Sequence, residues 1–462
     1  MKKNLNKKKR FSSFWRGLSL KRLFTKDNFN VIRSLPKVLS KIDRYLILFF
    51  VSVIAVAFFF LWRDYWLKTT HEEPAFGGTY TEGIVGEAKD LDKHITRLMG
   101  AGLTYLESTG EIKGDLAESW EIQQDGKVYQ FKLRPGYSSS DFANQITTKN
   151  IWPNIKVSTP SEDLLIFNFD QPFSPFLYAS TEPVFSYGPY KITKEDKTQI
   201  TLQAQDNYWR GKPHIEKIIL KLYPNTESLI KAAKNGDIMG YLKEKDDWQP
   251  ADFTTYEMSL PRELDIFFNL SKPDLQNVDR RRNLRDNKPI DKDLNLVLVT
   301  SENPKNLKVA EDLKAKWKDL KVNIEIKKYD NITLQRDIIP KRDYDILLYG
   351  LDYGADPDPY PFWHSSQIKS DGMNLSNYSN KKAYKLMEKA RQTFDFKERD
   401  DLYNQLKEIL DQDVPFITLE KETCYYSVSD DIKGINKIYG FAETDRFLKV
   451  SDWYIKSKRV KN

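Results

Sequence analysis

The segment 45–62, YLILFFVSVIAVAFFFLW, constrains this chain most, because it runs for eighteen residues without a charge. That length is near the minimum for crossing a hydrocarbon core of about 30 Å. The segment is apolar on every side, whereas a helix packed on a soluble core keeps a polar face. We therefore expect a transmembrane helix over 45–62. A signal peptide cut after Ala57 is the alternative, but the apolar run continues past Ala57 and favours an uncleaved anchor.

Charge is unevenly distributed over the 462 residues. Residues 1–44 hold 14 Lys and Arg against Asp27 and Asp43, a charge of +12, which leaves −5 for the rest of this +7 chain. A basic tail of this kind is expected to stay in the cytoplasm and to place the body outside the cell. The acidic body gives no indication of nucleic-acid binding. The single cysteine, Cys424, excludes an intrachain disulfide.

The body reads as an α/β protein. We expect residues 63–76 to form a polar tether, and residues 116–136 to form a hairpin that turns at Asp125-Gly126. From residue 294 the apolar pattern alternates as β-α-β-α-β, which is typical of a mostly parallel sheet with helices on its faces. Two amphipathic helices, at about 380–394 and 397–412, and a strand in DVPFITLEK follow.

The strand YDILLYG leads into an unusual loop, LDYGADPDPYPFW, at 351–363. Ligands bind at the carboxyl ends of strands in open α/β sheets, so this loop is a candidate pocket wall. Prolines stiffen it and aromatic side chains offer flat contact area. A calcium loop is not favoured, because Pro357 lies between Asp356 and Asp358 and Pro359 follows them. We expect Asp356 and Asp358 to cap or brace the loop.

The sequence shows no arrangement of catalytic residues. It has no serine elbow, no zinc-protease motif and no glycine-rich phosphate loop, and its four histidines are scattered. A glycosidase pair would need a second acidic cluster, which is not evident. We therefore predict a binding protein that is not an enzyme, with no cofactor and no metal site.

An ordered series of segments resembles the extracellular solute-binding proteins of ABC importers, family 5, the group that binds oligopeptides, dipeptides and nickel. The series covers roughly residues 77–450. Its members are GGTYTEGIVG (77–86), LAESWEIQQDGKVYQFKLRPG (116–136), SYGPYKI with QDNYWRGKPHIEKI (186–218), SLIKAAKNGDI (228–238), IFFNLSKP (266–273), YDILLYGLDYGADPDPYPFWHSSQ (344–367), NLSNYSN (374–380) and residues 397–414.

The resemblance implies a two-lobed clamp of the periplasmic-binding-protein type, with mixed and doubly wound sheets, preceded by one transmembrane helix. The first lobe would span 77–263, with a small strand-rich subdomain at about 105–185. The second lobe would span 264–440, and residues 441–462 would return to the first lobe. The clamp is trimmed, because YSSSDFANQI replaces a longer family segment after the hairpin and the region after IFFNLSKP is short.

The resemblance further implies the substrate-binding component of an ABC importer. It would capture oligopeptides between the lobes and deliver them to permease subunits and their ATPases. Asp352 would pair with the α-amino group of a peptide. The sequence leaves open a sugar oligomer or a metal chelate as ligand, and a trimmed surface scaffold or adhesion module as the alternative function. The candidate ligand contacts are Asp352, Tyr353, Tyr360, Trp363 and, from the facing lobe, Tyr105.

Overall fold

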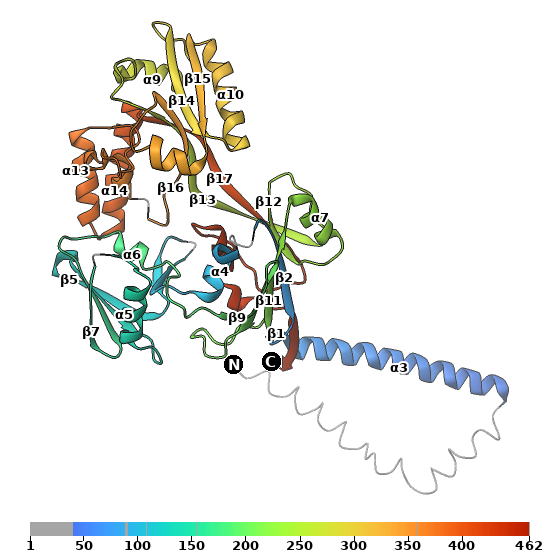
Figure 1. The fold of residues 1–462 in the computed structure, drawn as a ribbon. Helices are drawn as coiled ribbons and strands as arrows, with labels where there is room; N and C mark the ends of the chain where they lie inside the picture. Colours follow the sequence, from blue (N-terminus) through green and yellow to red (C-terminus); the bar gives the residue numbers. More distant parts are fainter. Residues whose placement is uncertain (1–39, 88–90, 108, 154, 357, 462) are drawn as a thin grey trace, which may run out of the picture. The chain divides into compact units, whose positions relative to one another are not determined.

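The computed structural model describes residues 40–87, 91–107, 109–153, 155–356 and 358–461 (Figure 1). They form two compact units. One comprises the described residues up to Glu73 together with those from Ser457, and the other is Pro74–Lys456. Most of the basic tail predicted over 1–44 lies outside the described residues.

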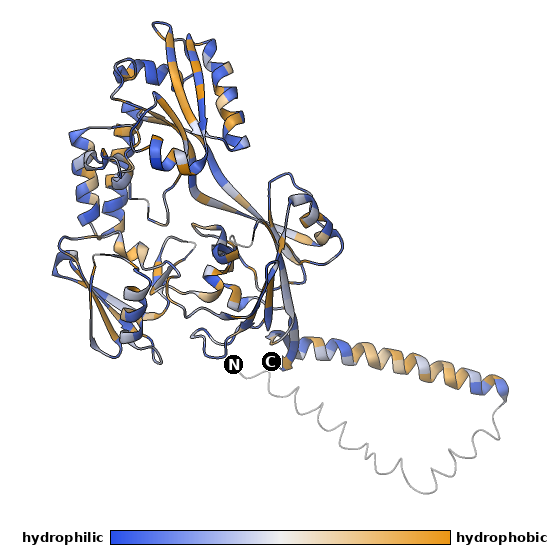
Figure 2. Ribbon diagram, viewed as in Figure 1, coloured by the Kyte–Doolittle hydropathy of each residue, from blue (hydrophilic) through white to orange (hydrophobic). Residues whose placement is uncertain are grey.

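The first unit contains the predicted membrane segment within one helix, α3 (Lys41–Thr69). Ser40 caps the start of α3, because its hydroxyl accepts a hydrogen bond from the Asp43 amide at 3.2 Å. The apolar stretch of α3 stands out in Figure 2. At a rise of about 1.5 Å per residue, α3 is long and apolar enough to cross a membrane.

The stretch 63–76, expected to form a polar tether, has regular secondary structure over most of its length. The helix α3 continues to Thr69, and the next residues form the strand β1 (Thr70–Ala75). This strand pairs with β18 (Lys456–Lys461) at the other end of the chain. The sequence of this stretch is polar, so its pattern did not reveal a strand whose partner lies almost 400 residues away.

Arg459 of β18 fastens the junction between α3 and β1. Its guanidinium donates to the Thr70 hydroxyl at 2.9 Å, to the Thr70 carbonyl at 2.8 Å and to the Leu67 carbonyl at 3.2 Å. It also lies 4.9 Å from the centre of the Trp66 ring. The Leu67 carbonyl belongs to the last turn of α3, whose carbonyls need partners outside the helix. Arg459 therefore holds the end of the helix and the start of the strand together.

We expect Arg459→Ala to loosen this junction. Several hydrogen bonds to Arg459 disappear together, each worth about 1 kcal/mol, so the strand β1 opens more often. Limited proteolysis of the full chain in detergent should cut residues 70–75 at least about tenfold faster, since cleavage follows the population of the open form. Lys458→Ala, an exposed change on the same strand, is the control. Equal cleavage of the two variants would contradict the role of Arg459.

A ten-stranded mixed sheet runs through the unit Pro74–Lys456 (Figure 1). We call the part built on β14–β16 the second lobe and the part built on β2 and β9–β12 the first lobe. In spatial order the strands are β15 (Val322–Tyr329), β14 (Leu294–Ser301), β16 (Ile346–Asp352), β13 (Phe253–Phe268), β17 (Phe416–Ser429), β12 (Gly240–Lys243), β2 (Thr79–Val85), β11 (Lys217–Tyr223), β10 (Gln199–Ala204) and β9 (Tyr190–Glu195).

The second lobe has helices on both faces of its strands. The strand β14 pairs in parallel with β15 and with β16, and successive side chains point to opposite faces. Leu298 packs in a core with α10 (Pro304–Lys318), and Val299 packs in another with α13 (Lys381–Gln392) and α14 (Phe396–Asp413). The predicted α/β class and the parallel pairing of these strands are confirmed.

A separate four-stranded sheet, in the order β5-β6-β8-β7, forms the small subdomain. Its core draws on residues between Ala101 and Phe185. The predicted hairpin is confirmed, because β5 pairs with β6 and the turn places Asp125 and Gly126 at positive φ. The elements are β5 (Ala117–Gln123), β6 (Val128–Leu133), α5 (Ser139–Thr148), β7 (Lys156–Ser161), β8 (Leu164–Asn168) and α6 (Phe176–Ala179).

Two long antiparallel strands, β13 and β17, carry the chain between the lobes (Figure 1). Met258 of β13 packs in the first-lobe core and Ile266 in a second-lobe core. Between these ends the register of β13 against β17 shifts from Ser259 to Glu263, and Pro261, which lacks an N–H, sits in the irregular stretch. The chain was expected to return to the first lobe at residue 441. Tyr426 already lies in the first-lobe core, so the return occurs within β17.

The remaining elements are short and flank these sheets. They are α4 (Leu91–Met99), β3 (Thr104–Leu106), β4 (Ile112–Gly114), α7 (Thr226–Lys234), α8 (Pro273–Gln276), α9 (Val278–Arg285), α11 (Asn331–Thr333), α12 (Tyr360–Trp363) and the 3₁₀ turns Gln124–Gly126, Ser365–Gln367, Glu443–Phe447 and Val450–Asp452, with a π turn at Leu334–Ile338.

Candidate ligand-binding site

A cleft of about 730 Å³ lies within the unit Pro74–Lys456, between the lobes and the small subdomain. Its volume is within the range of small-molecule sites, roughly 300–1,000 Å³. The lining comes from α4, two stretches of the small subdomain, Arg262 of β13, the end of β16 with the loop after it, and the segment after residue 440. Its charged lining residues are Lys93, Arg97, Lys149, Glu182, Arg262, Asp352, Glu443 and Asp445.

Asp352 stands in this cleft at the carboxyl end of β16. One carboxylate oxygen accepts a hydrogen bond from Arg262 Nε at 2.9 Å, and the other accepts one from the Gly354 amide at 2.9 Å. The Asp352 side chain remains 49 % exposed, so it is accessible from the cleft. The position at the end of a central strand follows the general rule for α/β sheets.

Arg262 is shared among three carboxylates. Besides Asp352, it lies 3.3 Å from Glu422 and 3.5 Å from Glu443. It sits in the irregular stretch of β13 where the chain passes between lobes. Arg262 alone therefore does not balance the charge of these three carboxylates.

The three predicted aromatic walls, all among the described residues, are not part of the lining of this cleft. Tyr353 donates its hydroxyl hydrogen to Asp265 at 3.2 Å. Tyr360 stacks on His364, with ring centres 4.0 Å apart. Trp363 is 3 % exposed and packs in a second-lobe core. Their contact with a ligand stays a prediction.

The acids Asp356 and Asp358 brace the loop, as predicted. Both oxygens of Asp356 accept from Arg399 Nη2, at 2.7 and 2.9 Å. Asp358 lies 2.7 Å from Arg391 and also accepts from the Tyr360 amide at 3.1 Å. Burial raises the pKa of Asp356 to about 6 although Arg399 lowers it. The arginines hold the loop against α13 and α14, so these acids do not form a catalytic pair.

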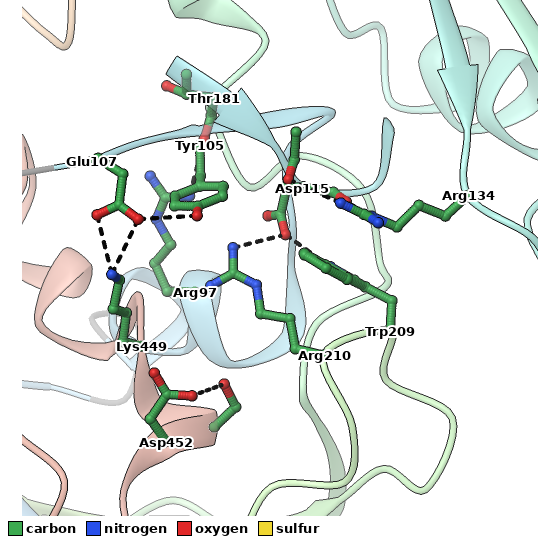
Figure 3. Close-up of polar contacts among 12 residues, drawn as sticks. Arg97, Tyr105, Glu107, Asp115, Arg134, Thr181, Trp209, Arg210, Lys449 and Asp452 are labelled. Carbon is green, nitrogen blue, oxygen red and sulfur yellow. Dashed lines mark hydrogen bonds and ion pairs between the residues drawn. The ribbon is translucent and has the colours of Figure 1, made fainter. Parts of the chain in front are cut away.

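Tyr105 belongs to a polar cluster that includes Glu107, Arg210 and Lys449 (Figure 3). The Arg210 guanidinium lies 4.3 Å from the centre of its ring, and its hydroxyl donates to Glu107 at 3.0 Å. Lys449 lies 3.1 Å from the other Glu107 oxygen. The residues that line the cleft do not include Tyr105, so its contact with a ligand also stays a prediction.

Asp115 is the buried centre of the same cluster. It is 3 % exposed and accepts hydrogen bonds from Trp209 Nε1 at 2.8 Å and from Arg210 at 3.2 Å (Figure 3). Burial raises the pKa of Asp115, while the charge of Arg210 lowers it. The Trp209-Arg210 pair therefore anchors the start of the small subdomain. Trp209 and Arg210 lie in one of the segments that carry the family resemblance, but their contact with Asp115 was not predicted.

Arg97 and Asp445 form another pair that sequence reasoning missed. Arg97 Nε lies 2.5 Å from Asp445, and Arg97 also donates to the Thr181 carbonyl at 3.0 Å. Both residues line the cleft. They are separated by 348 residues, so no local pattern could have revealed them. Among the described residues, no group of three or more His, Cys, Asp and Glu side chains could hold a metal ion.

Comparison with known proteins agrees with the predicted resemblance. Residues 154–285 match the family model "Bacterial extracellular solute-binding proteins, family 5 Middle". A probable D,D-dipeptide-binding periplasmic protein, DdpA, of Escherichia coli is 21 % identical, and the match covers 70 % of this chain and 82 % of DdpA.

Solved structures share the fold. The substrate-binding protein CtaP of Listeria monocytogenes superposes with a TM-score of 0.68 at 20 % identity, over 82 % of this chain and 99 % of CtaP. The oligopeptide-binding protein AppA of Bacillus subtilis, solved in complex with a nonapeptide, superposes with a TM-score of 0.63 at 17 % identity, over 83 % of this chain and 100 % of AppA. The predicted clamp fold is thereby confirmed.

Proposed function

We propose that this chain is a family 5 extracellular solute-binding protein, as the family-model match and the similar proteins support. It would capture oligopeptides for an ABC importer and deliver them to the permease subunits and their ATPases. The observation that carries the proposal is the cleft of about 730 Å³ with the accessible carboxylate of Asp352 at the end of β16. Two relatives are peptide binders by name, DdpA and AppA.

The charges around Arg262 suit the amino group of a peptide. An incoming ammonium group at Asp352 would let Arg262 keep its contacts with Glu422 and Glu443. The amine would then be paired on arrival, which offsets the cost of removing it from water. Arg262 lies where β13 passes between the lobes, so binding there would act directly on the segment that closes the clamp.

Membrane anchorage by α3 belongs to the same proposal. The helix runs past the possible cleavage point at Ala57 to Thr69, and Arg459 contacts its last turns at Trp66 and Leu67. These contacts favour an anchor that stays in place over a removed signal peptide. The basic tail would keep the N-terminus in the cytoplasm. Anchorage would raise the concentration of the clamp near its permease.

A thermal-shift screen tests the proposal. The full chain in detergent is melted with mixed peptides, oligosaccharides and nickel chelates. A ligand at 100 times its Kd adds about 2.7 kcal/mol of stability, so the matching class is seen as a raised Tm. We expect peptides to give the shift.

Asp352→Ala is expected to weaken peptide binding at least about tenfold, the equivalent of roughly 1.4 kcal/mol, because the amine loses its carboxylate. Asp371→Ala, a change at an exposed acid elsewhere in the second lobe, should bind as the wild type does. A raised Tm with oligosaccharides or with chelates, and not with peptides, would identify that class as the ligand. No shift with any class would favour the trimmed surface scaffold.

A further inference from the structure

Phe394, in the turn between α13 and α14, packs in a core that is not the core of its own helices. Met387 of α13 and Leu406 of α14 belong to the second-lobe core. The Phe394 ring instead packs against the core of the small subdomain, with its centre 6.3 Å from that of Tyr129. The second lobe therefore inserts one aromatic side chain into another part of the fold.

Gly126 lies directly against the Phe394 ring. It lies in the β5–β6 turn at φ +90°, and a Cβ atom at this position would collide with the Phe394 ring. Glycine is the residue that permits both the positive φ and the close approach. The turn of the hairpin is thus shaped to receive the ring.

A polar contact accompanies the ring. Ser174 of the small subdomain donates its amide to the Arg391 carbonyl at 2.8 Å and its hydroxyl to the Ala390 carbonyl at 3.1 Å. These carbonyls belong to the last turn of α13, where the Ala390 carbonyl also accepts from the Thr393 amide at 3.2 Å. The Ser174 side chain and its partner are buried, so separation of the two parts would leave polar groups unpaired.

The same turn is tied to the wall of the cleft. Arg391 pairs with Asp358 and lies 5.4 Å from the Phe173 ring, and Arg399 pairs with Asp356. These two acids brace the loop that begins at Asp352. Direct contacts therefore link the loop, through the two arginines, to the helices on either side of Phe394.

We propose that the α13–α14 turn is a closure latch, with Phe394 as its plug and the hairpin turn at Gly126 as its socket. The second lobe is joined to the first lobe at the crossing strands β13 and β17 and to the small subdomain at this latch. With the plug seated the cleft is held closed, and opening requires Phe394 to leave the subdomain core. Phe394 is thus a positioning residue for ligand capture, and this role holds whatever the ligand is.

Pulsed EPR distance measurement on the full chain tests the latch without any ligand. Nitroxide labels at Lys156 of the small subdomain and Lys328 of the second lobe, both exposed, report the separation in a Cys424→Ala background. We expect one short distance in the parent chain. Phe394→Ala should add a longer distance, with the closed-to-open ratio reduced at least about tenfold, or roughly 1.4 kcal/mol.

Two variants serve as controls. Phe394→Leu keeps an apolar plug and should restore much of the short distance. Lys397→Ala changes an exposed side chain at the start of α14 and should change the ratio less than about threefold. An unchanged distance in a folded Phe394→Ala would overturn the latch. If that variant does not fold, Ser174→Ala must shift the ratio in the same direction, and an unchanged ratio there overturns it equally. The EPR result does not depend on whether peptides raise the Tm in the thermal-shift screen.

Discussion

Arg446→Met is expected to destabilise the first lobe by about 3–5 kcal/mol, because it leaves the carboxylate of Glu82 buried without its cation. Both side chains are fully buried, and Arg446 Nε lies 2.9 Å from Glu82. The hydroxyls of Tyr80 and Tyr426 also donate to Glu82, at 2.7 and 3.0 Å. These two hydroxyls cannot replace a full positive charge.

Urea unfolding measures the loss of stability in Arg446→Met, and hydrogen exchange in β2 and β17 locates that loss in the first lobe. The double variant Glu82→Leu with Arg446→Met is the control. A buried ion pair replaced by apolar side chains is often neutral, so the double variant should recover most of the lost stability. A cost below about 1 kcal/mol for the single change would show that water or another group compensates Glu82.

The second large effect concerns Asp265, a fully buried acid of β13. Burial raises its pKa to about 7, and the charge of Glu263 adds to the rise. One of its oxygens has no hydrogen-bond partner among the described residues. The folded state holds the proton more tightly than the unfolded chain, so the charged form is penalised. Asp265 therefore does not lower the free energy of unfolding below a pH of about 4. Its destabilising effect grows between about pH 4 and 7 and is complete above about 7.

Asp265→Asn should therefore stabilise the protein at pH 8 by up to about 4 kcal/mol, at 1.36 kcal/mol for each unit of pKa, and should change little at pH 4. Thermal melts of the full chain between pH 4 and pH 8 give the comparison. Asp371→Asn, an exposed acid, should leave the pH dependence as it is. A profile for Asp265→Asn parallel to that of the wild type would contradict the assignment.

Elements with a strong local pattern could be predicted from the sequence. The apolar run of α3, the Asp125-Gly126 hairpin and the alternation of β14, α10 and β15 can each be recognised within one continuous stretch of the chain. The loop after β16 was also placed correctly at the end of a strand, and Asp352 does line the cleft.

Contacts between distant segments could not be predicted in this way. Arg262 meets Asp352 across 90 residues and Glu443 across 181, so nothing near Arg262 reveals its partners. The arginine run in α9 is a similar case. Arg281 donates to the Val414 carbonyl at 2.9 Å and Arg285 to the Asp411 carbonyl at 2.8 Å. They cap the C-terminus of α14, a role that the run itself does not indicate.

The pairing of β1 with β18 has a consequence for the order in which the protein matures. Synthesis produces the last residues of the chain long after the first. β1 must wait for Lys456–Lys461 before it finds its partner, and Glu82 must likewise wait for Arg446. The junction after α3 and the first lobe are thus completed last. A chain cut short during synthesis would leave both unfinished and open to proteases.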